Sequence, residues 1–387
     1  MTGNAPKEDD DDGLDLMSLP DAMKSEAALA WDVNYRGHVW QQVVAAAAAP
    51  NQQQELDSGE RRLNELGYKQ ELRRELTLFK CLAISFSTMM LFTGIVPLYG
   101  RSLLYAGPVG MVWGWVVVTF FTWFVGFAMA EICSSFPMGA IGVLDLCMAW
   151  GDWSNCRNWH AGTEILQNII LLCTHTNEHG GYFAPPGVFL AIYIALCIIW
   201  AMLNTCAINV IAIIDTASIY WQVIGGALLV ILLPLVSKTT QPASYVFTHF
   251  EIGDATTGVK SGVYAVLLSW LVSQYSLYGF NAAAYLTEET KGADVNGPIA
   301  ILSSIALISV FGWGILLVLT FSIQNPAYLY DPSNETSGSF VPAQILYDAF
   351  HGRYHNATGA IVLLFVIWGS FFFGGLSITT SAARVVS

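Results

Sequence analysis

Long stretches without a charged residue recur along this chain from Cys81 onward. Seven of them are long enough for a helix that crosses a bilayer, which needs about 20 apolar residues. They run from Lys80 to Arg101, Arg101 to Glu131, His179 to Asp215, Thr216 to Ser237, Ser261 to Thr287, Pro298 to Ile323 and Ala360 to Ala383. A weaker run, Ile165–Thr176, falls short of that length. The pattern predicts an all-α membrane protein whose loops lie at the charged positions, Asp215 among them.

Composition agrees with this pattern. Hydrophobic residues make up 54% of the chain and charged residues 12%, about half the charge of a soluble domain. Part of the net charge of −13 comes from the acidic run Glu8–Asp12, and no basic patch interleaves with aromatic residues. A nucleic-acid partner is therefore not expected. The spans hold almost no His, Asp or Glu, so we predict neither an enzyme active site nor a metal or cofactor.

The first 75 residues lack the apolar core of a secretory signal. We expect residues 1–75 to be a cytoplasmic tail, mostly disordered with a polar helix near its end, and residues 76–387 to be a polytopic membrane domain. Basic residues crowd the approach to the first span, which places the N-terminus inside. They are Arg61, Arg62, Lys69, Arg73, Arg74 and Lys80. Two glycosylation sequons, at Asn334 and Asn356, lie outside only if Ile165–Thr176 counts as a true span, so the sequence leaves the final topology open.

Two of the spans carry polar residues around a glycine, where a simple anchor would be Leu, Ile and Val. In the first span the polar residues accompany Gly94 and Pro97, which together loosen a helical hydrogen-bond ladder. They are Ser85, Ser87, Thr88 and Thr93. In the fifth span they surround Gly279. They are Ser273, Gln274, Tyr275, Ser276, Tyr278 and Asn281. Two interrupted helices in corresponding halves are typical of a carrier with its site near the middle of the membrane. The alternative is that both glycines only allow close helix packing.

Charged residues at the ends of the spans have two interpretations. Glu131 is either a gate charge or a residue of the membrane interface. The group Glu288, Glu289 and Lys291 follows the second interrupted span, and we expect it to be a solvated inner rim, with a gate network as the alternative.

Several long segments resemble a known family. Arg61–Lys80 resembles the N-terminal approach of plant bidirectional amino-acid transporters, which are grouped with GABA permeases and fungal choline permeases in the amino acid–polyamine–organocation superfamily. The resemblance continues through Ala130–Pro137, resumes at Glu164 and runs through Leu286–Asp294 to the C-terminus.

This resemblance implies an inverted-repeat transporter fold of the 5+5 type, with the substrate site on helices 1 and 6. It implies alternating-access transport of amino acids, GABA possibly among them, in a lipid bilayer. The membrane could be the plasma membrane, the Golgi or the mitochondrial membrane, and the oligomeric state is not specified. By position, the resemblance implies a substrate-binding set. It comprises Thr93, Gly94, Tyr275, Tyr278, Gly279 and Asn281.

The chain departs from the family pattern in three places. Met138–Gly162 is shorter than the family segment, which predicts a defective helix 3 with Ile165–Thr176 as its surviving end. Residues 377–387 resemble the end of helix 8, where family members continue through further helices, which predicts a fold truncated there. The family usually has Tyr-Asp and a later His where this chain has Phe280, Asn281 and Tyr285, and asparagine cannot ionise to support proton coupling. The alternative function is a non-transporting permease fragment or a membrane binding or regulatory protein.

Overall fold

A computed structural model gives the fold. It describes residues 58–65, 74–89, 91–135, 160–175, 181–205 and 208–386, and the predictions for Met138–Gly162 and for residues 1–75 fall mostly outside these ranges. Within them the regular structure is helical, apart from one isolated parallel bridge between Leu76 and Thr290. The prediction of an all-α membrane protein is confirmed at this level.

The longer helices are α4 (Leu78–Met89), α5 (Ile95–Ser135), α7 (Pro186–Asn204), α8 (Ile208–Val236), α14 (Ala293–Phe321), α15 (Val341–Tyr354) and α16 (Thr358–Val386). The shorter elements are α3 (Ser58–Glu65), α9 (Ala243–Thr248), α10 (Asp254–Thr257), α11 (Gly262–Ser269), α12 (Leu271–Ser276), α13 (Ala282–Tyr285), η2 (Thr287–Glu289) and η3 (Pro326–Tyr330). Residues 160–174 are also helical.

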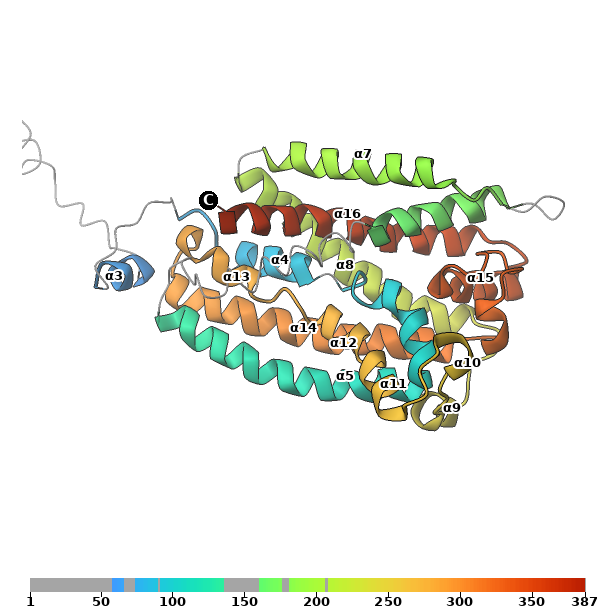
Figure 1. The fold of residues 1–387 in the computed structure, drawn as a ribbon. Coiled ribbons are helices and arrows are strands. Elements are labelled where there is room, and N and C mark those ends of the chain that lie inside the picture. The colour runs from blue at the N-terminus through green and yellow to red at the C-terminus, as the bar shows by residue number, and fades with distance from the viewer. Residues whose placement is uncertain are drawn as a thin grey trace, which may run out of the picture. The chain divides into compact units, whose positions relative to one another are not determined.

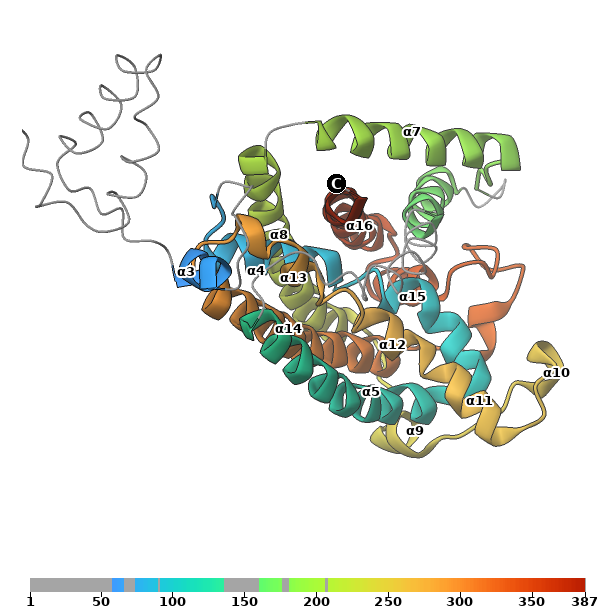
Figure 2. The same cartoon turned by 60° about the vertical axis from the view of Figure 1, so that its left-hand side comes forward.

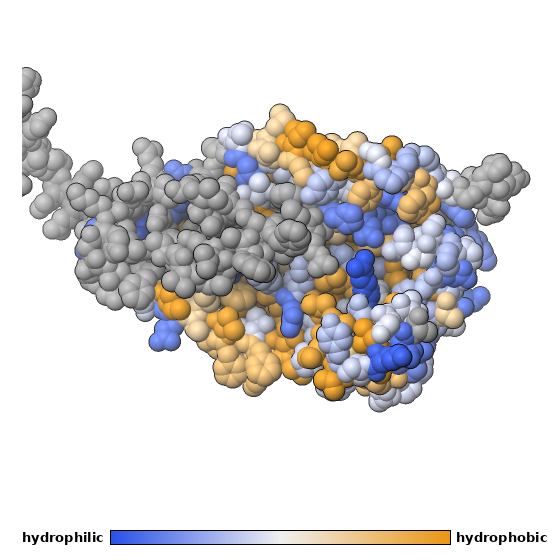
Figure 3. All heavy atoms as spheres, viewed as in Figure 1, coloured by the Kyte–Doolittle hydropathy of each residue, from blue (hydrophilic) through white to orange (hydrophobic). Residues whose placement is uncertain are grey.

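The described residues contain five helices that are long and apolar enough to cross a membrane. They are Ile95–Ser135, Pro186–Asn204, Val210–Val236, Ala293–Phe321 and Thr358–Thr380. Their outward faces carry large apolar side chains, such as Phe121 and Phe124 on α5 and Ile198 and Met202 on α7. In Figure 3 hydrophobic side chains cover the outer side of α7, whereas hydrophilic ones gather at the end where α10 and α15 lie in Figure 1. Exposed apolar helix faces of this length are suited to lipid.

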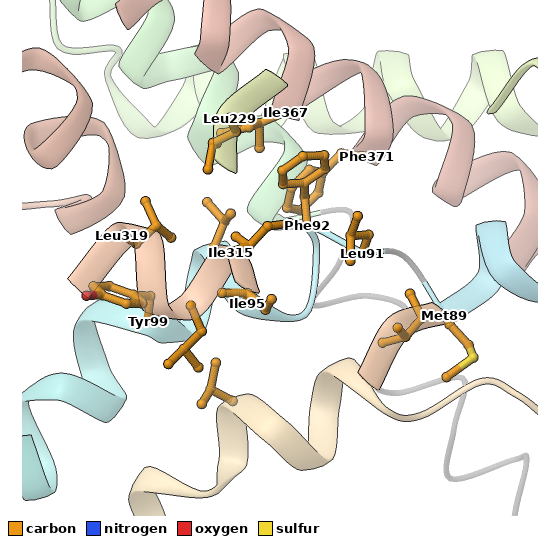
Figure 4. Packing of buried hydrophobic residues seen from close by; sticks show 14 of the residues in the cluster. Met89, Leu91, Phe92, Ile95, Tyr99, Leu229, Ile315, Leu319, Ile367 and Phe371 are labelled. Atoms are coloured by element: carbon orange, nitrogen blue, oxygen red, sulfur yellow. The ribbon is translucent and has the colours of Figure 1, made fainter. Parts of the chain in front are cut away.

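The long helices run side by side, with α14 packed against α4, α5 and α8, and α16 packed against α4 and α8 (Figure 1). The helix α7 lies at the edge of this bundle and packs against α16 (Figure 2). Figure 4 shows apolar side chains meeting beside the end of α4. Phe92 and Ile95 from the first interrupted span lie near Ile315 of α14 and Phe371 of α16. Each of these four side chains is buried, and within a bilayer such contacts stabilise the bundle through close packing between helices.

Two predicted helix boundaries are wrong. The sequence pattern ends the first span at Arg101, but Arg101 lies inside α5 with an exposed side chain, and the helical backbone breaks instead at Ala106 and Gly107. The pattern also places Asp215 in a loop, but Asp215 lies inside α8 and is fully buried. An exposed cation and a hydrogen-bonded carboxyl can both be accommodated within a helix, so neither charge had to end one.

The residues expected at the inner rim behave differently from one another. Lys291 is exposed, as predicted, whereas Glu289 is only 6% exposed, so the solvated-rim interpretation is wrong for Glu289. Glu131 is exposed at the end of α5.

The two glycosylation sequons differ in exposure. Asn334 is buried and its amide donates to the carbonyl oxygens of Tyr328 and Leu329, whereas Asn356 is exposed.

Candidate functional site

The first interrupted helix opens between the end of α4 at Met89 and the start of α5 at Ile95. Residues 91–94 form turns instead of helix. The backbone N–H of Leu91 donates to Oε1 of Gln222 on α8, at 3.0 Å. A side chain from a neighbouring helix therefore satisfies a backbone donor that the break releases, as apolar surroundings require.

The second interruption lies between α12 and α13. Its centre is Gly279, whose φ of +100° is rarely adopted by residues with a side chain. The carbonyl oxygen of Phe280 accepts a hydrogen bond from Ser85 Oγ of α4, at 3.3 Å. The same hydroxyl contacts Ser304 Oγ of α14, also at 3.3 Å. The second break is therefore tied to the helix that carries the first.

The two interruptions contact each other. A methyl group added at Gly94 would overlap Oγ and Cα of Ser276, so the backbone of the first break approaches α12 more closely than any larger residue allows. A methyl group added at Gly279 would lie 3.3 Å from the carbonyl oxygen of Thr88, at the end of α4. The structure thus interrupts the helix in both segments, and the two interruptions lie against each other.

We call the contact between the two interruptions the crossing. The six residues of the predicted binding set lie at or beside it, and their side chains differ in exposure. Thr93 is 1% and Asn281 8% exposed, and Gly94 and Gly279 are also buried. Tyr275 is half-buried, whereas Tyr278 is 39% exposed. The four buried residues thus lie within the two breaks themselves, and the two tyrosines lie at the margin of the crossing.

A cavity of about 500 Å³ begins next to Tyr275. Its walls are the first turns of α5, the start of the helix at residues 160–174 and the segment that leads into α15. Arg101, His160 and Glu164 supply ionisable groups to the wall. Of the predicted binding set, Tyr275 is the member that reaches this cavity. The cavity therefore leads to the margin of the crossing.

Sequence reasoning missed the polar side chains of α8 that support the first break. Gln222 donates through Nε2 to Ser218 Oγ at 3.0 Å, and Ser87 Oγ of α4 donates to the same oxygen at 2.8 Å. Ser218 and Gln222 are both fully buried. Their spacing of four residues inside an otherwise apolar run places them on one helix face, and this was the available signal.

At the opposite end from α15, the chain just before α4 pairs with the segment that follows η2. The backbone N–H groups of Glu75 and Leu76 both donate to the carbonyl oxygen of Glu289, at 2.9 Å each. Lys291 N donates back to Leu76 O at 2.9 Å, and Arg74 Nη1 donates to Thr290 O at 3.1 Å. We call this pairing of residues 74–76 with 289–291 the clamp. It holds the start of the first interrupted helix against the chain that leaves the second.

Comparison with known proteins gives one consistent result. The family model for amino acid permeases matches residues 76–387. The amino-acid permease BAT1 of Arabidopsis thaliana is 37% identical over 350 residues, which cover 85% of this chain and 67% of the relative. Its rice homolog is also 37% identical, over 85% of this chain and 66% of that protein. The GABA-specific permease of Saccharomyces cerevisiae is 29% identical over 84% of this chain and 58% of its own length. The chain thus spans about two thirds of the plant relatives and less of the yeast one.

Proposed function

The chain belongs to the amino acid permease family, and from that premise we propose that it carries amino acids across a membrane by alternating access. Members of this family are transporters rather than enzymes, and the five apolar helices agree with an integral membrane protein. We assign transport to residues 76–387, with residues 1–75 as a preceding cytoplasmic tail, and an inverted repeat of the 5+5 type as the underlying architecture.

The observation that carries the proposal is the contact between the two interrupted helices. Interrupted helices expose backbone N–H groups at a positive dipole end and carbonyl oxygens at a negative one. An amino acid presents a carboxylate and an ammonium group, which these ends can bind. We place the head group at Thr93, Gly94, Gly279 and Asn281, with Tyr275 and Tyr278 closing the site. GABA is a candidate substrate because one relative is named for it.

The two ends of the bundle support alternating access. The clamp joins two segments at the end near α13, whereas the cavity of about 500 Å³ lies toward α15, at the other end in Figure 1. The basic residues before α4 support an orientation with the clamped end on the inner side. A carrier with one end held together and a cavity at the other is what one state of such a transport cycle requires.

Uptake into liposomes tests the proposal. The purified chain should take up labelled alanine or GABA in a saturable manner that unlabelled substrate inhibits. Tyr275→Ala should raise the half-saturating concentration, because Tyr275 lies between the cavity and the crossing. Tyr264→Ala is the matched control, since Tyr264 precedes the same break but is 55% exposed on α11.

A different outcome separates transport from binding. If alanine raises the unfolding temperature of the chain but no substrate enters the liposomes, the protein binds without transporting. If neither effect is seen with alanine or GABA, the proposed function is wrong for these substrates.

A further inference from the structure

A short polar helix lies at the clamped end of the bundle. The helix α3 packs against α14, at the end where α13 lies (Figure 2). Its sequence, Ser-Gly-Glu-Arg-Arg-Leu-Asn-Glu, is polar along most of its length. Burial of apolar surface therefore contributes little to its attachment. The attachment depends on polar and close backbone contacts, and a change of charge at one of them can release the helix.

The contacts of α3 reach both segments of the clamp. Ser58 Oγ donates to Oδ1 of Asp294, in the first turn of α14, at 2.6 Å. Gly59 is buried, and a methyl group added there would overlap Nη1 of Arg74 and lie 3.1 Å from the backbone nitrogen of Ala293. Arg74 belongs to one segment of the clamp, and Ala293 comes shortly after the other. The helix thus bridges the two segments that must part if this end opens.

Ser58 is the contact of α3 that is most open to modification. Its side chain is exposed. Three carboxylates lie close to it in the sequence, at Glu55, Asp57 and Glu60, and they suit a protein kinase with a basic substrate groove. The basic residues before α4 support a cytoplasmic position for this end, where ATP is available.

A phosphate at Ser58 would act on two contacts at once. Phosphoserine carries a charge of about −1.5 to −2 at pH 7, and it would replace the hydroxyl that donates to the Asp294 carboxylate, so the two groups would repel each other. The same phosphate would attract the guanidinium of Arg74, which lies against Gly59 and donates to Thr290 O at 3.1 Å. Repulsion at Asp294 and competition for Arg74 both weaken the link between the two segments of the clamp.

We propose that α3 is a strap that holds the clamp together, and that Ser58 is a phosphorylation site that releases it. The Ser58 hydroxyl oxygen bonds to the γ-phosphorus of ATP held by a protein kinase. The bond from that phosphorus to the oxygen that bridges to the β-phosphate breaks, ADP leaves, and the hydroxyl proton passes to a base of the kinase. The inference adds regulation to the proposed function, and its effect on uptake rests on that function.

The test measures how fast a maleimide modifies Cys81, which follows the clamp in α4 and is 0% exposed. The full chain is prepared in detergent with phosphoserine encoded at position 58, and peptide-resolved mass spectrometry quantifies the label. A solvent-exposed hydrogen bond to a charged group contributes up to about tenfold to an equilibrium constant. Labelling of Cys81 should therefore rise by up to about tenfold, and alanine uptake into liposomes should rise with it.

Matched variants separate charge from a merely structural role. Ser58→Asp should raise the labelling of Cys81 as phosphoserine does. Combining Ser58→Asp with Asp294→Asn should restore the protection, because the new amide can donate to the new carboxylate. Asn64→Asp adds the same charge to another exposed residue of α3, and it should leave the labelling unchanged.

The inference is overturned if phosphoserine at position 58 leaves the labelling of Cys81 unchanged, or if Asn64→Asp raises it as much as Ser58→Asp. A double variant that stays as reactive as Ser58→Asp would contradict repulsion from Asp294. Mass spectrometry of the chain isolated from its own cells, with phosphatases inhibited, should find phosphate at Ser58, and its absence would contradict the modification site. If the labelling responds as expected but no form of the chain takes up amino acids, the strap is supported and the proposed transport function fails.

Discussion

At the scale of single residues, Gly279 is the position where the backbone most directly requires one amino acid. Its φ is +100°, and a methyl group there would meet the carbonyl oxygen of Thr88 at 3.3 Å. Strain of this kind costs about 1–3 kcal/mol. Gly279→Ala should therefore lower both the unfolding temperature and alanine uptake. Gly187→Ala is the control, because nothing lies within 4 Å of the added methyl in α7, and it should leave both unchanged. If Gly279→Ala and Gly187→Ala had the same unfolding temperature and the same alanine uptake, backbone strain at Gly279 would be contradicted.

Gln222 tests the support that α8 gives to the first break. In Gln222→Leu the N–H of Leu91 loses its acceptor in a buried setting, which costs about 1–3 kcal/mol. Thermal unfolding in detergent should show the loss, and uptake should fall with it. Thr216→Val is a matched change on the same helix, since the Thr216 hydroxyl donates within α8 to Ala212 O. An equally large loss of stability in Thr216→Val would show that the effect of Gln222→Leu does not come from the lost hydrogen bond to Leu91.

At the scale of elements, the sequence predicted both interruptions because each combines a glycine with several polar residues in an apolar run. The family resemblance grouped both interruptions in one binding set, but the residue pattern by itself did not predict that they touch, since the contact between Gly94 and Ser276 joins residues far apart in the chain. Hydropathy also treated Asp215 as a loop residue. That rule fails where a second helix brings a donor, as α16 brings Ser377. The tertiary partner that makes the charge tolerable cannot be read from the run itself.

The segment between α14 and α16, which includes α15, contains two neighbouring carboxyl groups that can titrate. Gln344 of α15 donates to Glu335 Oε2 at 2.9 Å and to Asp348 Oδ1 at 2.7 Å, so one amide holds two carboxyl groups together. Burial raises the pKa of Asp348 from 3.8 to about 6, with the Glu335 charge adding to the effect. Because this pKa is higher in the folded state, the stabilisation is complete below the unfolded value and is lost as pH rises through about 6.

The resulting prediction concerns stability against pH. Asp348→Asn should match the original chain at pH 3, below the unfolded pKa, and exceed it at pH 8 by about 1–2 kcal/mol, after allowance for partial exposure to solvent. Thermal unfolding at both pH values measures the difference. Asp331→Asn is the control, since hydrogen bonds from Ser333 lower the pKa of Asp331 and its loss should give no gain at pH 8. A gain for Asp348→Asn that is the same at both pH values would contradict the raised pKa.

At the scale of the whole molecule, the clamp and the cavity at its two ends predict which surfaces change accessibility during transport. Cys81 follows the clamp in α4 and is 0% exposed, whereas Cys173 is exposed in the helix at residues 160–174. In the clamped state a maleimide should therefore modify Cys173 and spare Cys81. Leu76→Pro removes one of the two N–H groups that donate to Glu289 O and should loosen the clamp.

Peptide-resolved mass spectrometry of the labelled protein provides the measurement. Labelling of Cys81 should rise in Leu76→Pro, and in the original chain it should rise when alanine drives the carrier through its cycle. Cys173 acts as an internal control for total reagent in each sample. Unchanged protection of Cys81 under both conditions would mean that the clamp does not open, because opening at residues 74–76 is the step that must expose the start of α4. A carrier that works by alternating access has to pass through that step, so the labelling pattern distinguishes a moving gate from a static seal.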